Sequence, residues 1–167
     1  MIRELWAVAL LCATAAPLAA APATPEGAAA IETALRTYLG QTPGVIAVVP
    51  EGESYALTLD PAPWIALAGQ GMTVEVTPIH FRLADNGDGT WAVTQNGPLS
   101  IRFDRPGTFA FQAAAETASI DCTFDLGLKA CRTSTVTASG ISSRQRHTAT
   151  DGAVTEVAYG VGTLSAG

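Results

Sequence analysis

Few residues of this chain are placed to do chemistry, and the clearest pair is a histidine and a carboxylate. His147 and Glu156 flank an Asp151-Gly152 turn signal, and a two-residue hairpin turn there predicts that the two side chains stand opposite each other. An imidazole beside a carboxylate is the start of an acid/base site. It is also an ordinary cross-strand pair, and no nucleophile or third orienting group is predicted beside it. We therefore expect no catalytic residue and no enzymatic activity.

Two cysteines form the second candidate. Cys122 and Cys131 flank a turn around Gly127, and pairing of Phe124 with Lys129 would set the two cysteines directly opposite each other. At a non-hydrogen-bonded position of a hairpin the strands lie close enough for a disulfide. A redox or zinc site would want a tighter C-x-x-C spacing or more ligands, and neither is present. A structural disulfide is the prediction.

A calcium-like segment is the third candidate. Asn86, Asp88 and Gly89 fit positions three, five and six of an EF-hand loop, but Ala84 and Gln95 would occupy positions one and twelve, where carboxylates are required. A hairpin turn is therefore the favoured interpretation. The motifs of serine hydrolases, zinc proteases, phosphate loops and dinucleotide sites are all missing. We expect no metal and no cofactor.

Composition limits the partners. The chain has 167 residues, of which 48% are hydrophobic and 14% charged, with 9 Lys and Arg against 15 Asp and Glu. Such a chain is long enough for one core of ordinary size. A net charge of -6 leaves too few cations to neutralise a run of phosphates, which argues against nucleic-acid binding.

The first segment has the organisation of a secretory signal. An apolar run over residues 5–16 precedes a stretch rich in small residues over 17–23, with cleavage expected near Ala21 or Ala23. Lipid attachment at Cys12 is the alternative, but the residues before it lack the usual small side chain. We therefore expect a signal peptide over 1–23, a single β-rich domain over 24–167, and a periplasmic or secreted location. No later apolar run is long enough to span a membrane.

The remaining pattern predicts one helix followed by strands. Thr24, Pro25 and Glu26 supply an N-cap and a first turn, and apolar residues then recur at helical spacing, which predicts a helix over about 25–39. From Gly44 onward the period becomes two and turn residues interrupt every six to ten positions. The predicted fold is mostly β: an N-terminal amphipathic helix packed on a strongly curved antiparallel meander sheet, half-barrel or barrel-like. Pro78 is expected to bend its strand.

The predicted hairpins put large apolar side chains on one face. Three pairings are expected: Val45, Ala47 and Val49 with Tyr55, Leu57 and Leu59; Phe81 and Leu83 with Val93 and Trp91; Ile101 and Phe103 with Phe111 and Phe109. One short helix would cover only part of so wide a face. Either the sheet curls on itself or part of the face stays open.

An open face leads to two hypotheses. The first is a groove that binds a hydrophobic ligand such as a lipid, with the ligand groove formed by Phe81, Leu83, Trp91, Phe103, Phe109 and Phe111. The second is a non-catalytic structural or interaction module of the cell envelope, which would pair with another protein through an exposed strand edge.

A resemblance points the same way. The stretch from Thr73 to Phe103, with Phe81-Arg82-Leu83, Asn86-Gly87-Asp88-Gly89-Thr90 and Pro98-Leu99-Ser100-Ile101, resembles an uncharacterised family of exported β-repeat proteins of Gram-negative bacteria, known only as a domain of unknown function. The helix followed by a long meander is similar in architecture to the open-barrel lipid and lipoprotein carriers of the periplasm. These resemblances imply an exported β protein and transfer no catalytic residue.

Overall fold

The computed structural model describes residues 22–68, 71–125 and 127–167, so residues 1–21 of the predicted signal peptide lie outside the described residues. The first element is helix α1, Pro25–Leu39, as predicted. The Thr24 hydroxyl accepts a hydrogen bond from the Gly27 N–H at 3.0 Å, and proline occupies the first turn. Gly40 ends the helix with a positive φ of 85°. The N-cap and the proline therefore fix where the helix begins.

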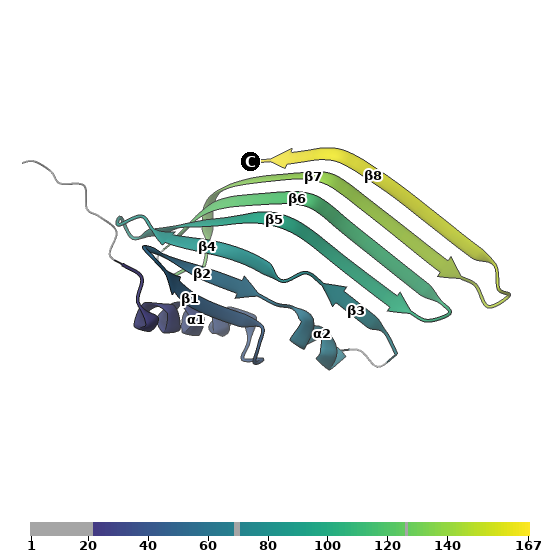
Figure 1. Ribbon diagram of the computed structural model, residues 1–167, viewed down its shortest axis with the longest axis horizontal. Helices are drawn as coiled ribbons and strands as arrows, with labels where there is room; N and C mark the ends of the chain where they lie inside the picture. Colours follow the sequence, from purple (N-terminus) through teal and green to yellow (C-terminus); the bar gives the residue numbers. More distant parts are fainter. Residues whose placement is uncertain (1–21, 69–70, 126) are drawn as a thin grey trace, which may run out of the picture.

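Eight strands form one antiparallel sheet (Figure 1). Their bounds are β1 Ile46–Glu51, β2 Ser54–Leu59, β3 Thr73–Val76, β4 Ile79–Asp85, β5 Thr90–Arg105, β6 Phe109–Asp125, β7 Cys131–Thr148 and β8 Val154–Ala166. The order across the sheet is β1-β2-β4-β5-β6-β7-β8, and β3 also pairs with β5. The predicted mostly β fold is confirmed, and the sheet is curved but not closed.

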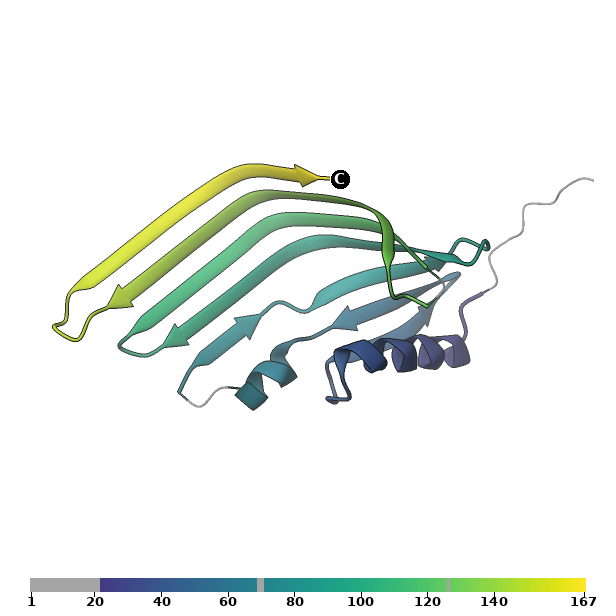
Figure 2. The same cartoon turned by 180° about the vertical axis from the view of Figure 1, so that it is seen from behind.

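Helix α1 covers one end of one face, which we call the inner face. It lies behind the sheet in Figure 1 and in front of it in Figure 2, against β1. Gly27 lets the Tyr55 ring approach the helix, because a Cβ at this position would collide with the Tyr55 hydroxyl. The buried core beneath the helix consists of Ala28, Ile31, Val45, Ile46, Val48, Leu57, Leu83, Val93 and Leu128. We call this region the covered half.

The long strands bend along a line that we call the crease (Figure 1). Pro78 separates β3 from β4 along the same side of β5, as the sequence predicts. The register between β5 and β6 shifts between Gly97 and Leu99, and Gly140 on β7 has a φ of 59°. Bulges and left-handed residues in adjacent strands bend a sheet together. Beyond the crease, β3 and the far segments of β5 to β8 form the open half, which α1 does not reach.

A second helix, α2, spans Ala62–Ala68 and contacts β3. The sequence pattern predicts only strands after α1, so this helix is a correction to that prediction. Asp60 accepts a hydrogen bond from the Ala62 N–H at 2.9 Å, and Pro61 lies just before the helix and Pro63 in its first turn. That combination is a helix start signal, which the alternating apolar pattern on either side does not reveal.

The predicted hairpins form, but their registers differ. Leu83 pairs with Val93, Phe103 with Phe111 and Ile101 with Ala113, each a slip of two residues from the predicted partners. A slip of two keeps every side chain on its face, so the apolar face is as expected. In the first hairpin the predicted face of β2 is confirmed, with Leu57 buried, and the predicted face of β1 is wrong. Ile46 and Val48 are buried, whereas Val49 is exposed.

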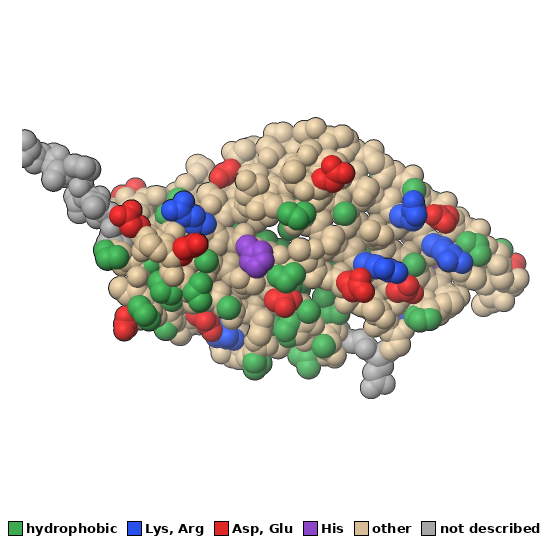
Figure 3. Space-filling view, in the orientation of Figure 1, with side chains coloured by type: hydrophobic (Ala, Val, Ile, Leu, Met, Phe, Trp, Pro, Cys, Tyr) green, Lys and Arg blue, Asp and Glu red, His purple; other side chains and the backbone are tan. Residues whose placement is uncertain are grey.

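The outer face of the sheet, opposite α1, is polar. Figure 3 shows this face, with acidic and basic side chains distributed over it. The Arg102 Nη2 and Asp104 Oδ2 atoms lie 3.8 Å apart, and the hydroxyl groups of Thr77 and Ser100 form a hydrogen bond of 2.6 Å. Exposed ion pairs of this kind add little stability, so this face is solvated rather than structural.

Candidate functional site: an apolar groove along the crease

An apolar groove of about 380 Å³ lies on the inner face where the sheet bends. Its lining comes from β3 to β7 and contains no charged side chain: Val76, Thr77, Ile79, Leu99, Ser100, Ile101, Ala113, Ala114, Ala115, Ala118, Ile120, Val136, Ala138 and Ile141. The volume falls in the range of small-molecule sites.

Side-chain size gives the groove its depth. Four alanines of the lining lie on the inner face of β6 and β7, whereas the flanking inward positions carry Ile, Leu and Val. The four are Ala113, Ala115, Ala118 and Ala138. Ala113 lies opposite Ile101, and Ala115 lies opposite Leu99. A row of methyl groups between longer side chains leaves a trough, because no neighbouring element fills the space above them.

A smaller cavity of about 180 Å³ lies under α1 in the covered half. Leu35 and Leu39 of the helix line one side, and the sheet and the β6–β7 loop supply Leu57, Leu59, Phe81, Leu83, Val93, Phe124 and Leu128. The groove and the cavity therefore share the inner face and are separated by the middle of β4, β5 and β6.

The structure divides the predicted groove residues into two groups. Phe81 and Leu83 line the smaller cavity, and Trp91 packs against the same core with its ring edge-on to Tyr55 at 6.0 Å. Phe103 and Phe111 pair across β5 and β6 with ring centroids 6.0 Å apart, in the open half.

The third phenylalanine of the open half, Phe109, lies opposite Arg105 at the end of the same strand pair. None of the six predicted residues is among those that line the larger groove. The alanines that form its floor were not predicted, because large apolar side chains indicate a buried face whereas a groove forms where side chains are small.

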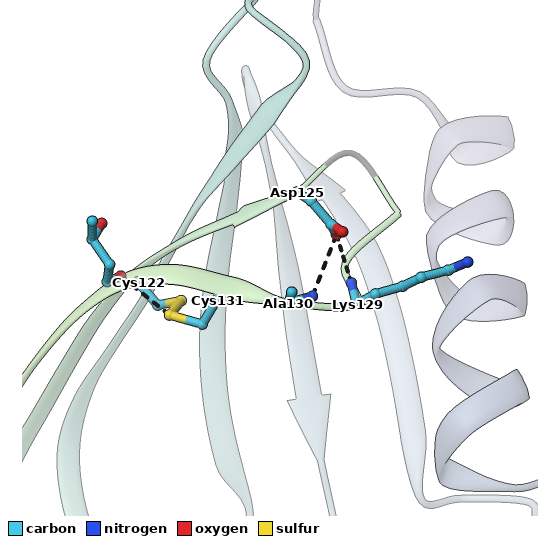
Figure 4. Close-up of a disulfide and its surroundings, with 6 residues drawn as sticks. Cys122, Asp125, Lys129, Ala130 and Cys131 are labelled. Carbon is cyan, nitrogen blue, oxygen red and sulfur yellow. Dashed lines mark hydrogen bonds between the residues drawn. A yellow bond between two sulfur atoms is a disulfide. The ribbon is translucent and has the colours of Figure 1, made fainter.

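The disulfide joins Cys122 to Cys131, as predicted, with Cα atoms 5.9 Å apart (Figure 4). The two residues are not directly opposite. Cys122 pairs with Ser134, and Cys131 pairs with Phe124 beyond a register shift. The predicted pairing of Phe124 with Lys129 is therefore wrong, since the bulge adds residues to the connection.

The loop inside the disulfide reaches the core. Asp125 accepts hydrogen bonds from the backbone N–H groups of Lys129 at 2.7 Å and Ala130 at 3.4 Å (Figure 4). Leu128 takes a left-handed φ of 53° and is buried against the covered half. The disulfide and the carboxylate thus hold a strained residue that closes the cavity under α1.

The predicted pairing of His147 with Glu156 is wrong by one residue. The β7–β8 turn has three residues between Ala149 and Ala153, not two, and this places His147 opposite Thr155. Glu156 lies opposite Arg146 and forms an exposed ion pair with Arg144, with 3.5 Å between Nε and Oε1. The shift of one residue moves the carboxylate to the other face of the sheet, so the proposed acid/base pair has no geometric basis.

The segment that resembles a calcium loop forms the β4–β5 turn. The Thr90 hydroxyl donates to Asp88 Oδ1 at 2.6 Å, and the Thr90 N–H donates to the same atom at 3.0 Å. These hydrogen bonds, the hydroxyl first, lower the pKa of Asp88 below its ordinary value. Within the residues that the structure describes, no three His, Cys, Asp or Glu side chains gather as a metal site would require.

Strand β8 is the exposed edge of the sheet. It pairs with β7 alone among the described strands, and every residue of it is exposed. Val157, Tyr159, Val161 and Leu164 are its largest side chains on the inner face, and Tyr159 is 62% exposed. Glu156 is its one charged residue. Edges that avoid association usually carry lysines, prolines or bulges, and this strand has no lysine or proline.

In the described ranges, no helix has the length and apolar character needed to cross a bilayer. Comparison of the chain with known protein families, curated proteins and solved structures finds no match. The fold and the groove are therefore the basis for any functional argument.

Proposed function

We propose that this chain is an exported, periplasmic protein that binds a hydrophobic ligand, such as the acyl chain of a lipid, in the groove along the crease. The observation that carries the proposal is an apolar trough of about 380 Å³ without a charged side chain on a face that α1 leaves uncovered. An uncovered groove of this volume with an apolar lining is typical of sites that bind apolar ligands. Binding of this kind needs no catalytic group.

The disulfide supports the proposed location. Structural disulfides persist in oxidising compartments such as the periplasm, and Cys122 and Cys131 are joined. The resemblance to exported β-repeat proteins and to open-barrel lipid carriers stays a prediction that agrees with this proposal.

The test fills the groove and measures binding. Ala113→Phe and Ala115→Phe place rings on its floor, whereas Ala110→Phe adds the same ring to the outer face of the same strand, where Ala110 pairs with Asp104 and Arg146. The full chain is purified from the periplasm without detergent, and retained lipid is measured by native mass spectrometry together with displacement of a dye that fluoresces in apolar surroundings.

We expect retained lipid and dye binding in the wild type and in Ala110→Phe, and at least about a tenfold loss of affinity in the two groove variants. Thermal unfolding of all four proteins verifies that they fold. A wild-type chain that retains no lipid and binds no dye would rule out the proposal, as would equal binding by the groove variants.

A second function is favoured by the exposed edge at β8. We propose as the alternative that β8 pairs with an extended strand of another chain, and a second copy is the simplest occupant because β8 carries one charge in 13 residues. Replacing Val157 and Val161 by lysine should then abolish self-association measured by light scattering, with lipid retention unchanged. A wild-type chain that stays monomeric at all accessible concentrations would count against it.

A further inference from the structure

Strand β8 forms one rim of the sheet (Figures 1 and 2), and the backbone groups along this rim point outward in a definite order. The Ala149 N–H donates to the Ala153 carbonyl at 2.8 Å, from β7 toward β8. The preceding N–H, that of Thr148, donates to the Thr108 carbonyl and so points toward β6. In an antiparallel pair this direction alternates from residue to residue. Odd-numbered residues of β8 therefore bond to β7, and even-numbered residues direct their N–H and C=O groups away from the sheet.

The side chains of β8 are arranged symmetrically about Tyr159. Val157 and Val161 lie two residues on either side of it on the inner face, and Ala158 and Gly160 lie one residue away on the outer face. The tyrosine and both valines are exposed. A strand with the same pattern in both directions is complementary to a second copy of itself in antiparallel orientation.

We propose that two copies of this chain pair through β8 about a two-fold axis at Tyr159, so that Val157 of each copy meets Val161 of the other. This inference rests on the alternative function proposed above, and it adds the register of the pairing. The partner is then a second copy of the same strand, matched residue by residue, rather than any extended segment.

The backbone fits this register. Ala158 of one copy faces Gly160 of the other, and Glu156 faces Gly162 at the crease, so residues with outward hydrogen-bonding groups meet each other. Tyr159 and the two valines then occupy the non-hydrogen-bonded positions, where opposing side chains lie closest. A shift by one residue would set the inner face of one copy beside the outer face of the other.

Charge favours the same register. Glu156 is the one charged residue of β8, and it forms an exposed ion pair with Arg144. Like charges directly opposite each other destabilise a strand pair. With the axis at Tyr159, each Glu156 stands opposite Gly162, where a Cβ would have nothing within 4 Å. The two carboxylates are therefore kept apart, and each has room beside a residue without a side chain.

This pairing joins the two sheets into one. The two-fold axis is perpendicular to the sheet, because inner-face residues pair with inner-face residues. Both copies therefore present the inner face, with the groove along the crease, on the same side. An isologous contact is complete with two copies, so it also covers an edge that would otherwise be open to further strands.

The test places single cysteines on the inner face of β8. Opposing residues at non-hydrogen-bonded positions lie close enough for a disulfide between two strands. Tyr159→Cys, Val157→Cys and Val161→Cys are made in the full chain, in which Cys122 and Cys131 are already joined to each other. Each variant is oxidised mildly, as is a mixture of the two valine variants that is first diluted and then concentrated so that copies exchange. Covalent dimer is measured by non-reducing electrophoresis and intact mass, and light scattering gives the mass of the wild type in solution.

We expect Tyr159→Cys to form covalent dimer at least about tenfold faster than either valine variant alone. In this register the two copies of Val157 are offset by four residues, about 13 Å at roughly 3.3 Å per residue, which is beyond the reach of a disulfide. The same holds for Val161. The mixture of the two valine variants should cross-link about as fast as Tyr159→Cys, and it retains the tyrosine contact. Thermal unfolding verifies that the variants fold, as expected at exposed positions.

Two results overturn the inference, and they differ in what they say about self-association. If the wild type forms dimers, but neither Tyr159→Cys nor the mixture cross-links faster than the single valine variants, the copies pair in another register or through another surface. The register is then wrong, while self-association stands. If the wild type is monomeric at every accessible concentration, the inference and the alternative function are both wrong. Neither result affects the proposal that the groove binds a lipid.

Discussion

The covered half and the open half of the sheet use the same alternating pattern for different purposes. In the covered half, Leu57, Leu83 and Val93 are buried beneath α1 and the β6–β7 loop. In the open half, the floor is alanine and the edge side chain Val161 is 47% exposed. The covered half buries its apolar surface within the chain, whereas the open half leaves its apolar surface exposed. Stability should therefore reside in the covered half, and binding in the groove and the open half.

The largest expected effect separates the halves directly. Leu83 is 1% exposed, so Leu83→Ala should lower the free energy of unfolding by about 2 to 5 kcal/mol through lost burial and a cavity. Val161→Ala, at the exposed edge, should cost less than about 1 kcal/mol. Urea unfolding measures both. Similar losses at the two sites would show that the halves do not differ as described.

Next in size is the disulfide. Replacing Cys122 and Cys131 by serine should cost about 2 to 3 kcal/mol, because the unfolded chain gains the entropy of an open loop whose ends are 9 residues apart. The loss should be seen in urea unfolding, and reduction of the wild type by dithiothreitol should match it. If the double variant is as stable as the oxidised wild type, the loop that contains Leu128 keeps its conformation without the disulfide.

A smaller effect is expected at the crease in the open half. Gly140 has a φ of 59°, and a Cβ there would lie 2.6 Å from Glu116, so Gly140→Ala should cost about 1 to 2 kcal/mol. Gly162 on β8 is the matched control, because a Cβ there has nothing within 4 Å. Thermal unfolding and dye binding of both variants would test whether the bend shapes the groove. If the two variants have the same thermal stability and the same dye affinity, Gly140 is not required for the bend.

The cap of α1 should matter by about 1 kcal/mol. Thr24→Ala removes the hydroxyl that accepts from the Gly27 N–H and should destabilise the covered half by that amount, whereas Thr24→Ser keeps the acceptor and should restore most of it. Circular dichroism during urea unfolding is the measurement. Failure of serine to restore stability would argue against a capping role.

The smallest effect concerns pH at the β4–β5 turn. Because the folded pKa of Asp88 is lowered, the ionised carboxylate stabilises the turn above its ordinary pKa, and this stabilisation is lost as the pH falls through the folded pKa. The Asp88→Asn variant should therefore be slightly less stable than the wild type at neutral pH and equal to it in acid. A titration of the Asp88 side chain by NMR gives the direction independently. A stability difference between the wild type and Asp88→Asn that grows as the pH falls would contradict a lowered pKa of Asp88.

The covered half was the more predictable part. The Thr24 cap and Pro25 define the start of α1 in any context, and alternation alone placed Phe81, Leu83 and Trp91 on the inner face. Alternation specifies a face but not a register, since a slip of two residues preserves the pattern. Turn geometry decides the register, and the extra residue in the turn around Asp151 was enough to separate His147 from Glu156.

The candidate site was less predictable for a physical reason. A groove forms where side chains are small. No pattern in the sequence distinguishes Ala113 and Ala115 on a groove floor from alanines in an ordinary packed strand. Pro78 predicts the crease on one strand. The bend at Gly140 depends on bulges in adjacent strands, and these bulges are aligned only in the folded sheet.

The neighbour-to-neighbour topology has a consequence for local opening. From β5 to β8 each strand pairs with the strands next to it in the chain, so the sheet behaves as a linear array in which each hairpin depends on its neighbours. Fluctuations that detach β8 leave the α1 core intact, and those that detach β7 cost more. Amide exchange should therefore be graded across the sheet, fastest at β8 and slowest at β2 and β4. The groove along the crease is lined by residues of β3 to β7. A bound ligand would contact several hairpins at once, so it should slow amide exchange in these strands.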